Sequence, residues 1–304
     1  MYDIAIIGAG PAGLTCGIYA ARAGLSALLL ERQFAGGQIT STHLLENYPG
    51  FAEGIAGMDF SMALAAQAQR FGVAPEAREA TGIERRADGS FFVQTGEGGF
   101  EARTVVLALG AQPRKLGLPR EEEFTGAGVS YCATCDGAFF KNRTVVVVGG
   151  GDTALEDALY LSNLAQKVFV MHRRIELRAQ QVLADRARAR ENIEFLLNKR
   201  PVELLGGLDF EGVAYEDVQT GERGQLNVDG CFVAVGYVPD VKLAADLVAR
   251  DAQGYIVAGE NCKTSCPGIF VAGDTRTKPL RQVVTAAADG AVAAAMAREY
   301  LQNA

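Results

Sequence analysis

Two stretches of the chain share one order of apolar and polar positions. Residues 3–7 form a mainly apolar run that ends at Gly8, and residues 144–148 form another that ends at Gly149. A glycine-rich turn and a stretch with helical apolar spacing follow each run, and a second apolar run closes each stretch, at 26–30 and at 168–171. The pattern predicts two strand–turn–helix–strand units.

The two units are copies of a degenerate repeat. A shift of 141 residues aligns the first copy with the second, without a gap, as far as Glu31. The first glycine of each turn allows the tight bend, the second allows backbone N–H groups to approach a pyrophosphate, and a small third residue lets the helix pack closely. The helix N-terminus then faces the phosphates with its positive dipole end. Two copies in this setting predict two dinucleotide-binding folds, rather than two ordinary turns that merely need glycine.

The end of the second apolar run distinguishes the two sites. Glu31 can accept hydrogen bonds from ribose hydroxyls, and its carboxylate would repel a 2′-phosphate. The shifted position holds His172, followed by Arg173 and Arg174, with Arg178 one turn further on. This cluster suits a 2′-phosphate through charge and bidentate donors, although a solvated basic patch is the alternative. We predict that the first site takes a dinucleotide without that phosphate and that the second takes NADP(H).

A Cys-x-x-Cys pair, Cys132 and Cys135, ends nine residues before the second copy of the repeat. Such a pair can open and close a disulfide, or it can hold half of a zinc site. Zinc needs two more ligands, and the other close pair, Cys262 and Cys266, belongs to a different predicted domain, so we expect no metal. The nearby nucleotide turn instead indicates a redox-active dithiol with a source of electrons. We expect the remaining cysteines, Cys16, Cys231, Cys262 and Cys266, to be packing residues, although a second redox pair at 262 and 266 is the alternative.

The order of the strand-like runs predicts how the domains are connected. Runs at 104–109 and 231–235 stop at glycine and proline, which indicates linkers near 112–117 and 238–244. The tail, a strand at 269–272 and an alanine-rich helix at 281–301, has too few strands for a domain and is expected to complete the first one. The predicted fold is α/β, with two Rossmann-like (three-layer ββα) domains, the second inserted into the first. The first would span 1–113 and 244–304, and the second, carrying the dithiol, 114–243.

Composition and charge narrow the class of protein further. The chain has 304 residues, 49% of them hydrophobic, and a net charge of -7, which disfavours general nucleic-acid binding. No apolar run reaches the roughly 18 residues of a membrane span. No basic segment precedes the first strand, so we expect no signal peptide and a cytoplasmic location. His43, the second histidine, is expected to be a loop residue without chemistry, although a role near a flavin is the alternative.

Over essentially its whole length the chain resembles the low-molecular-weight thioredoxin reductases, class II of the pyridine nucleotide-disulfide oxidoreductases. The resemblance rests on both glycine fingerprints, the Cys-Ala-Thr-Cys-Asp-Gly motif at 132–137, and the segments at 36–38, 46–50, 273–274 and 281–282. It implies a FAD site formed by Gly8, Gly10, Pro11, Ala12, Gly13, Glu31, Arg32, Gly37, Gln38, Asn47, Ala111, Gly273, Asp274, Arg281 and Gln282. It implies an NADPH site formed by Gly149, Gly151, Asp152, Thr153, Ala154, His172, Arg173, Arg174 and Arg178.

The resemblance also implies an activity and roles for three residues. In a flavoprotein homodimer, NADPH reduces FAD, FAD reduces the Cys132–Cys135 disulfide, and the dithiol reduces thioredoxin. Cys135 would face the flavin, Cys132 would attack the partner's disulfide, and Asp136 would be the acid/base. Because the dithiol and the NADPH site share one domain and need the same flavin, we expect that domain to rotate on its two linkers.

Other functions remain as alternatives. The partner could be another small redox protein, such as a peroxiredoxin or a glutaredoxin-like protein. A flavin dithiol oxidase has no use for NADPH, so the arginine cluster argues against it, and ferredoxin-NADP reductases of similar build lack the cysteine pair. A redox-sensing or metal-binding scaffold without catalysis would require both glycine turns to be empty.

Overall fold

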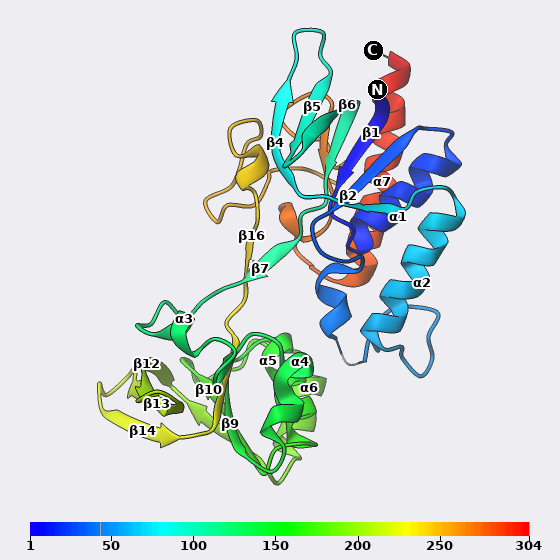
Figure 1. Cartoon of the computed structure of the whole chain (residues 1–304). Coiled ribbons are helices and arrows are strands. Elements are labelled where there is room, and N and C mark those ends of the chain that lie inside the picture. The colour runs from blue at the N-terminus through cyan, green and yellow to red at the C-terminus, as the bar shows by residue number, and fades with distance from the viewer. Residues whose placement is uncertain (43, 304) are drawn as a thin grey trace. The chain divides into compact units, whose positions relative to one another are not determined.

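The computed structural model describes residues 1–42 and 44–303, so the expectation for His43 lies outside the described residues. The chain divides into two compact units, one formed by residues 1–112 and 238–304 and the other by residues 113–237 (Figure 1). The second unit is thus inserted into the sequence of the first. No helix of the described chain is long and apolar enough to cross a membrane.

The first unit is built on a sheet whose strands follow the order β3-β2-β1-β6-β5-β4, with β17 also paired to β6. The strands around β1 are parallel, and β4, β5 and the first half of β6 form an antiparallel extension. The strands are β1 (Tyr2–Ile7), β2 (Ala27–Glu31), β3 (Pro75–Ala77), β4 (Ala80–Arg85), β5 (Phe91–Thr95), β6 (Gly98–Leu107) and β17 (Ile269–Val271).

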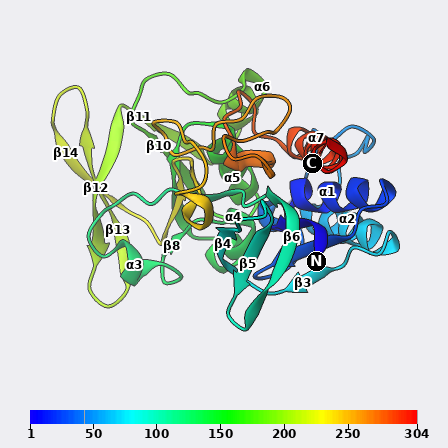
Figure 2. The same cartoon turned by 90° about the horizontal axis from the view of Figure 1, so that it is seen from above.

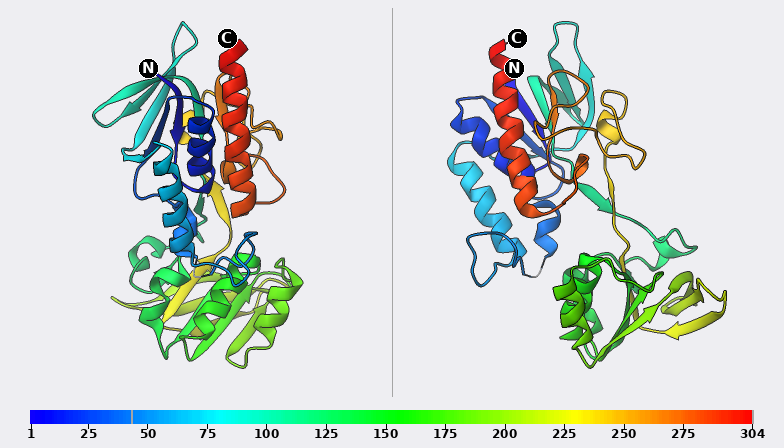
Figure 3. Two further views of the ribbon diagram at one scale, coloured as in Figure 1. Left: turned by 90° about the vertical axis from the view of Figure 1, so that its right-hand side faces the viewer. Right: turned by 180° about the vertical axis from the view of Figure 1, so that it is seen from behind.

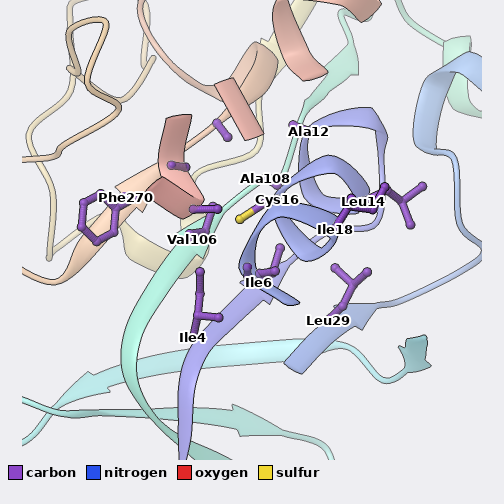
Figure 4. Close-up of a cluster of buried hydrophobic side chains, with 14 of the residues drawn as sticks. Ile4, Ile6, Ala12, Leu14, Cys16, Ile18, Leu29, Val106, Ala108 and Phe270 are labelled. Carbon is purple, nitrogen blue, oxygen red and sulfur yellow. The ribbon is translucent and has the colours of Figure 1, made fainter. Parts of the chain in front are cut away.

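Helices α1 (Pro11–Arg22) and α7 (Val283–Asn303) lie side by side on this unit, as Figure 2 and Figure 3 show, with α2 (Gly57–Arg70) beyond α1. Their close approach requires glycine at position 290, because a Cβ there would lie 2.1 Å from the Ala12 carbonyl oxygen. Apolar side chains of α1, β1, β2, β6 and β17 fill the space beneath the two helices (Figure 4). The packed residues include Ile4, Ile6, Leu14, Ile18, Leu29, Val106 and Phe270.

The second unit has a parallel sheet in the order β11-β10-β9-β15-β8. The chain between β11 and β15 forms a separate antiparallel sheet in the order β12-β13-β14. Its main helices are α5 (Asp152–Ser162) and α6 (Gln181–Arg188), with short α3 (Glu121–Phe124) and α4 (Ala133–Asp136) before them. The strands are β8 (Val129–Ser130), β9 (Thr144–Gly149), β10 (Lys167–His172), β11 (Ile193–Leu197), β12 (Lys199–Gly206), β13 (Phe210–Asp217), β14 (Arg223–Asn227) and β15 (Gly230–Ala234).

The two copies of the repeat fold alike. The first is β1, a glycine turn, α1 and β2, and the second is β9, a glycine turn, α5 and β10. In both, the outgoing strand pairs in parallel with the incoming one. The prediction of an α/β protein with two Rossmann-like domains is confirmed, and the expected C-terminal helix at 281–301 runs from Val283 to Asn303.

The two connections between the units pair with each other. They are β7 (Ala111–Pro113) and β16 (Tyr237–Pro239), and the Arg114 amide donates to the Gly236 carbonyl at 2.8 Å. Each connection is preceded by a glycine in the left-handed region, Gly110 with φ +66° and Gly236 with φ +103°. Each connection therefore begins at a residue whose conformation favours glycine, Gly110 in the first unit and Gly236 in the second.

Candidate functional site

The first glycine turn leaves an open stretch of backbone at the start of α1. Gly8 has φ +102°, and a Cβ there would lie 2.3 Å from the Ala108 carbonyl oxygen. A Cβ on Gly13 would lie 1.8 Å from the Gly8 carbonyl oxygen, so the helix approaches the strand as closely as backbone allows. At Gly10, by contrast, the nearest atom is the Gly36 oxygen at 4.0 Å. The turn thus offers exposed backbone at a helix N-terminus, which fits a pyrophosphate.

Glu31 lies at the end of β2 beside this turn. Its carboxylate accepts hydrogen bonds from the Ala9 amide at 2.8 Å and the Gln33 amide at 3.0 Å, which fix its orientation. The neighbouring predicted residue, Arg32, pairs with Asp240 at 3.7 Å. A surface pocket of about 400 Å³ opens beside Glu31, with mainly apolar walls that suit a nucleobase. Its lining comes from the end of β2, from α2 and from β3, namely Glu31, Gln33, Ala35, Met62, Ala65, Ala66, Gln69, Pro75 and Ala77.

Two hydrogen bonds bring together predicted residues that are far apart in sequence. The Gln38 amide, in the 3-10 turn Gly37–Ser41, donates to the Ala111 carbonyl oxygen. The Asn47 amide donates to Gln282 Oε1 at 2.9 Å. Gln38 therefore contacts Ala111, and Asn47 contacts Gln282, within the first unit, as a shared ligand site requires.

Asp274, in the turn Gly273–Thr275, carries an unused acceptor. Its Oδ1 is buried and has no hydrogen-bond partner in the described chain. Burial raises the pKa of this carboxyl, while Lys278 and Arg281 oppose the rise. Arg281 also stacks on Tyr255, with 3.8 Å between the guanidinium carbon and the ring centre. A buried acceptor without a donor fits a ligand hydroxyl group, because such a group is costly to leave unsatisfied.

A buried ion cluster that the sequence reasoning missed supports this turn. Asp289 of α7 accepts hydrogen bonds from the Gly273 amide at 3.0 Å, from Arg276 Nε at 2.9 Å and from Lys278 Nζ at 2.7 Å. Burial alone would raise the pKa of Asp289, but the bonds from Arg276 and Lys278 lower it. The one available signal was an acidic residue in the buried stripe of an alanine-rich helix.

The second glycine turn has the same open backbone and is tied to the arginine loop. A Cβ on Gly150 would meet the His172 ring at 2.4 Å, whereas a Cβ on Gly151 would have no contact within 4 Å apart from its chain neighbours. The Asp152 carboxylate, at the start of α5 before Thr153 and Ala154, accepts from the Gln180 amide at 2.7 Å and its side chain at 2.8 Å. The Arg178 amide donates to the Gly150 carbonyl at 2.6 Å. These bonds hold residues 173–180 against the turn.

The three predicted arginines of this loop are exposed. Arg173, Arg174 and Arg178 have no ion pair or side-chain hydrogen bond with another described residue. His172 is buried, and burial lowers its pKa; a hydrogen bond with the Glu176 backbone opposes this shift, and the positive arginines add to it. The arginines therefore form a cluster of positive charge whose donors are available to an anion.

The cysteine pair lies at the short helix α4. Cys132 and Cys135 form a disulfide with their Cα atoms 5.3 Å apart, and the Cys135 amide donates to Cys132 Sγ at 3.2 Å. Cys135 is exposed and Cys132 is half-buried. The pair therefore occurs as a disulfide that other groups can reach, in the same compact unit as the arginine cluster.

Asp136 follows the pair and is held by a serine that the sequence reasoning did not single out. Ser130 Oγ donates to Asp136 Oδ2 at 2.6 Å and accepts from the Cys132 amide at 3.0 Å. A hydroxyl next to a redox motif is too common in sequence to indicate this contact.

The four remaining cysteines are free and buried, as predicted for packing residues. Burial raises the pKa of Cys16, and it raises the pKa of Cys231 and of Cys262 to about 12, so these thiols stay protonated. Among the described residues no group of three or more His, Cys, Asp or Glu side chains is arranged to hold a metal ion.

Comparisons with known proteins show the family to which the chain belongs. The pyridine nucleotide-disulphide oxidoreductase family matches residues 2–290. A thioredoxin reductase of Listeria monocytogenes is 46% identical over 100% of this chain and 95% of its own. The crystal structure of Lactococcus lactis thioredoxin reductase (FR conformation) superposes with a TM-score of 0.97 at 42% identity, covering 100% of both chains. A ferredoxin-flavin thioredoxin reductase from Clostridium acetobutylicum superposes with a TM-score of 0.55 at 30% identity, covering 100% of this chain and 99% of that one. The chain therefore belongs to the pyridine nucleotide-disulphide oxidoreductase family and, within it, to the low-molecular-weight thioredoxin reductases.

Proposed function

We propose that this chain is an NADPH-dependent reductase of thioredoxin disulfide that uses FAD. The family implies a flavin and a nicotinamide nucleotide, which together would supply hydride transfer and a two-electron reduction of a disulfide. The observation that carries the proposal is the Cys132–Cys135 disulfide in one compact unit with an open glycine turn and three arginines available to an anion.

The choice of NADPH as the electron donor rests on the arginine loop. One structural neighbour, at 30% identity, is a ferredoxin-flavin thioredoxin reductase, so the likeness alone leaves the electron donor open. Arg173, Arg174 and Arg178 provide charge and bidentate donors for a 2′-phosphate, and the open backbone at Gly151 provides a place for a pyrophosphate. Ferredoxin has no 2′-phosphate and no pyrophosphate, so neither feature would be needed to bind it.

The choice of FAD for the first unit rests on four groups, each of which fits one part of the FAD molecule. The backbone at Gly10 would hold the pyrophosphate, Glu31 would accept the ribose hydroxyls, and Asp274 Oδ1 would accept a hydroxyl of the chain that leads to the flavin ring. The pocket beside Glu31 would hold the adenine. Since Glu31 is negative, a 2′-phosphate is disfavoured there.

In the proposed reaction the two cysteines have different roles. Once reduced, Cys132 attacks the thioredoxin disulfide and forms a mixed disulfide. Cys135 then attacks Cys132 Sγ, which restores the Cys132–Cys135 disulfide and releases the second thioredoxin sulfur, and Asp136 gives that sulfur its proton. Asp136 cannot assist by charge, because a carboxylate disfavours the thiolate, so proton transfer is its useful role.

The proposal includes motion of the inserted unit. The dithiol and the arginine loop belong to one unit, and the groups assigned to FAD belong to the other. Both must reach the same flavin, and the dithiol must also reach a protein substrate, so we expect the unit to rotate about β7 and β16. We also expect a homodimer in the cytoplasm, which light scattering and cell fractionation would test.

Anaerobic stopped-flow spectroscopy tests the proposal. We expect the purified protein to contain flavin, NADPH to reduce it much faster than NADH, and oxidised thioredoxin to reoxidise it. Absence of bound flavin would contradict every flavoenzyme assignment. Fast reoxidation by a peroxiredoxin or a glutaredoxin, but not by thioredoxin, would change the partner.

A further inference from the structure

Ser130 and Asp136 form part of a closed set of hydrogen bonds around Cys132. The Ser130 hydroxyl donates to Asp136 Oδ2 at 2.6 Å, and the Cys132 amide donates to Ser130 Oγ at 3.0 Å. The Asp136 amide donates to the Cys132 carbonyl at 3.2 Å, which closes the set. Through these three bonds the carboxylate keeps a fixed place relative to the backbone of the first redox cysteine.

Ser130 is suited to this role because the sheet holds it. It is the last residue of the edge strand β8, it is only 4% exposed, and it is paired in register with Phe232 of the neighbouring inner strand β15. Asp136, in contrast, ends the four-residue helix α4, where the chain passes into a 3-10 helix of four residues, Gly137–Phe140. A short helix gives its last side chain little support, so the buried serine is the rigid member of the pair.

The two carboxylate oxygens of Asp136 differ in their hydrogen bonding. A hydroxyl has one proton, and the 2.6 Å contact directs it to Asp136 Oδ2 rather than to the Cys132 carbonyl at 3.2 Å. In the described chain Oδ1 receives no hydrogen bond. Since a carboxyl group carries one transferable proton, this arrangement leaves Oδ1 to hold and release it.

We propose that Ser130 is a positioning residue that acts through Asp136, holding Oδ2 so that Oδ1 can give the proton to the departing sulfur. The inference rests on the function proposed above. In the balanced step, the enzyme dithiol becomes the Cys132–Cys135 disulfide and the thioredoxin disulfide becomes a dithiol. Two electrons and two protons pass from the enzyme dithiol to thioredoxin. The proton of Cys132 ends on the first thioredoxin sulfur, and Asp136 takes the proton of the attacking Cys135 thiol and gives it to the last sulfur.

The test is a double-mutant cycle on the exchange step. Enzyme is reduced beforehand, mixed with oxidised thioredoxin, and followed in a single turnover for Ser130→Ala, Asp136→Asn and the double variant. We expect Ser130→Ala to be about tenfold slower than wild type, which is a part of the roughly 10²- to 10⁴-fold that general acid catalysis contributes, because Asp136 itself remains. The double variant should be no slower than Asp136→Asn alone, because the serine acts through the carboxylate.

Two further variants separate positioning from general damage to the fold. Ser130→Thr keeps the hydroxyl and should recover most of the rate. Ser162→Ala removes another buried serine of the same unit, whose hydroxyl donates to the Leu159 carbonyl at 2.7 Å, and should leave the rate unchanged. Flavin content and the rate of flavin reduction by NADPH should be unaffected in all serine variants.

The outcomes distinguish this inference from the proposed function. An unchanged rate in Ser130→Ala, or losses that multiply in the double variant, would overturn the role of Ser130. Failure of the wild type to reduce thioredoxin would overturn the proposed function instead. In that case the same cycle is measured with bis(2-hydroxyethyl) disulfide, a small disulfide whose alkyl sulfur takes up a proton on leaving, as the acceptor, and the same criteria decide on Ser130.

Discussion

At the scale of single residues, Cys132 and Cys135 differ in accessibility although they share one disulfide. If Cys135 is the flavin-facing thiol, Cys132→Ser should keep a thiolate next to bound flavin and show a long-wavelength charge-transfer band. Cys135→Ser should lose that band, and both variants should lose thioredoxin reduction. Absorbance spectra of the reduced variants check this. The band appearing only in Cys135→Ser would exchange the two roles.

The arginine loop predicts the preference for the nucleotide. Replacing Arg173 and Arg178 by Gln removes two charged donors, so KM for NADPH should rise by about 10- to 100-fold while the kinetics with NADH change little. Arg190→Gln, an exposed arginine of the same unit, is the matched control and should change neither. Steady-state kinetics with both nucleotides measure the effect. Equal losses with NADPH and NADH would mean that the arginines do not read the 2′-phosphate.

Asp157 of α5 predicts how stability depends on pH. Burial, with a smaller contribution from Glu156, raises the pKa of this half-buried carboxyl to about 7. The folded state then holds a proton that the unfolded chain loses above about pH 4, so the carboxyl lowers stability as the pH rises from 4 to 7. Asp157→Asn removes this dependence. The gain should be on the order of 1 kcal/mol at pH 8, reduced by the partial exposure, and near zero at pH 4.

Thermal unfolding of the holoenzyme at pH 4, 6 and 8 measures the gain. Asp209→Asn, at an exposed aspartate of the same unit, is the control and should show no trend with pH. A gain from Asp157→Asn that is the same at all three pH values would reject the pKa argument.

At the scale of elements, the sequence predicts best where the constraint is local. The two glycine turns were predictable because Gly8 and Gly13 leave no room for a side chain and the flanking runs have clear periods. The antiparallel strands β12 to β14 were not predicted, because half-exposed strands of mixed polarity, such as Arg223–Asn227, carry a weak pattern. Helix α4 was not predicted for another reason: the hydrogen bonds at its start involve Ser130, which lies outside the helix.

The tightest of these turns gives a prediction for an element as a whole. Gly13→Ala would place a methyl group 1.8 Å from the Gly8 carbonyl oxygen, so α1 must move away from β1. We expect a loss of about 2–3 kcal/mol in the free energy of unfolding, with weaker flavin retention. In Gly96→Ala nothing lies within 4 Å and φ is not positive, so this control should be neutral. Denaturant unfolding and flavin content measure both. A neutral Gly13→Ala would refute the close packing of α1 on β1.

At the scale of the whole molecule, the insertion was predictable because the C-terminal tail could not form a domain of its own. The paired connections β7 and β16 were not, since three-residue strands lie below any periodic signal. Asp289 shows a related limit, because its partners Arg276 and Lys278 precede it by 13 and 11 residues, in a turn outside helix α7 that no periodic pattern indicates. Contacts between distant segments follow from the completed fold and from no local pattern.

The two connections supply the last prediction. Gly110 and Gly236 have positive φ at the start of β7 and β16, where a rotating unit needs its backbone to change conformation. Replacing both by alanine costs about 1 kcal/mol at each site and narrows the accessible conformations. Steady-state turnover should fall several-fold, whereas the reduction of thioredoxin by pre-reduced enzyme in a single turnover should change less.

Gly24→Ala with Gly221→Ala imposes the same strain in two open turns away from the connections, with φ +78° and +75°. This control should lose similar stability and keep its turnover. Equal turnover in both double variants would mean that the glycines of the connections are not the hinge.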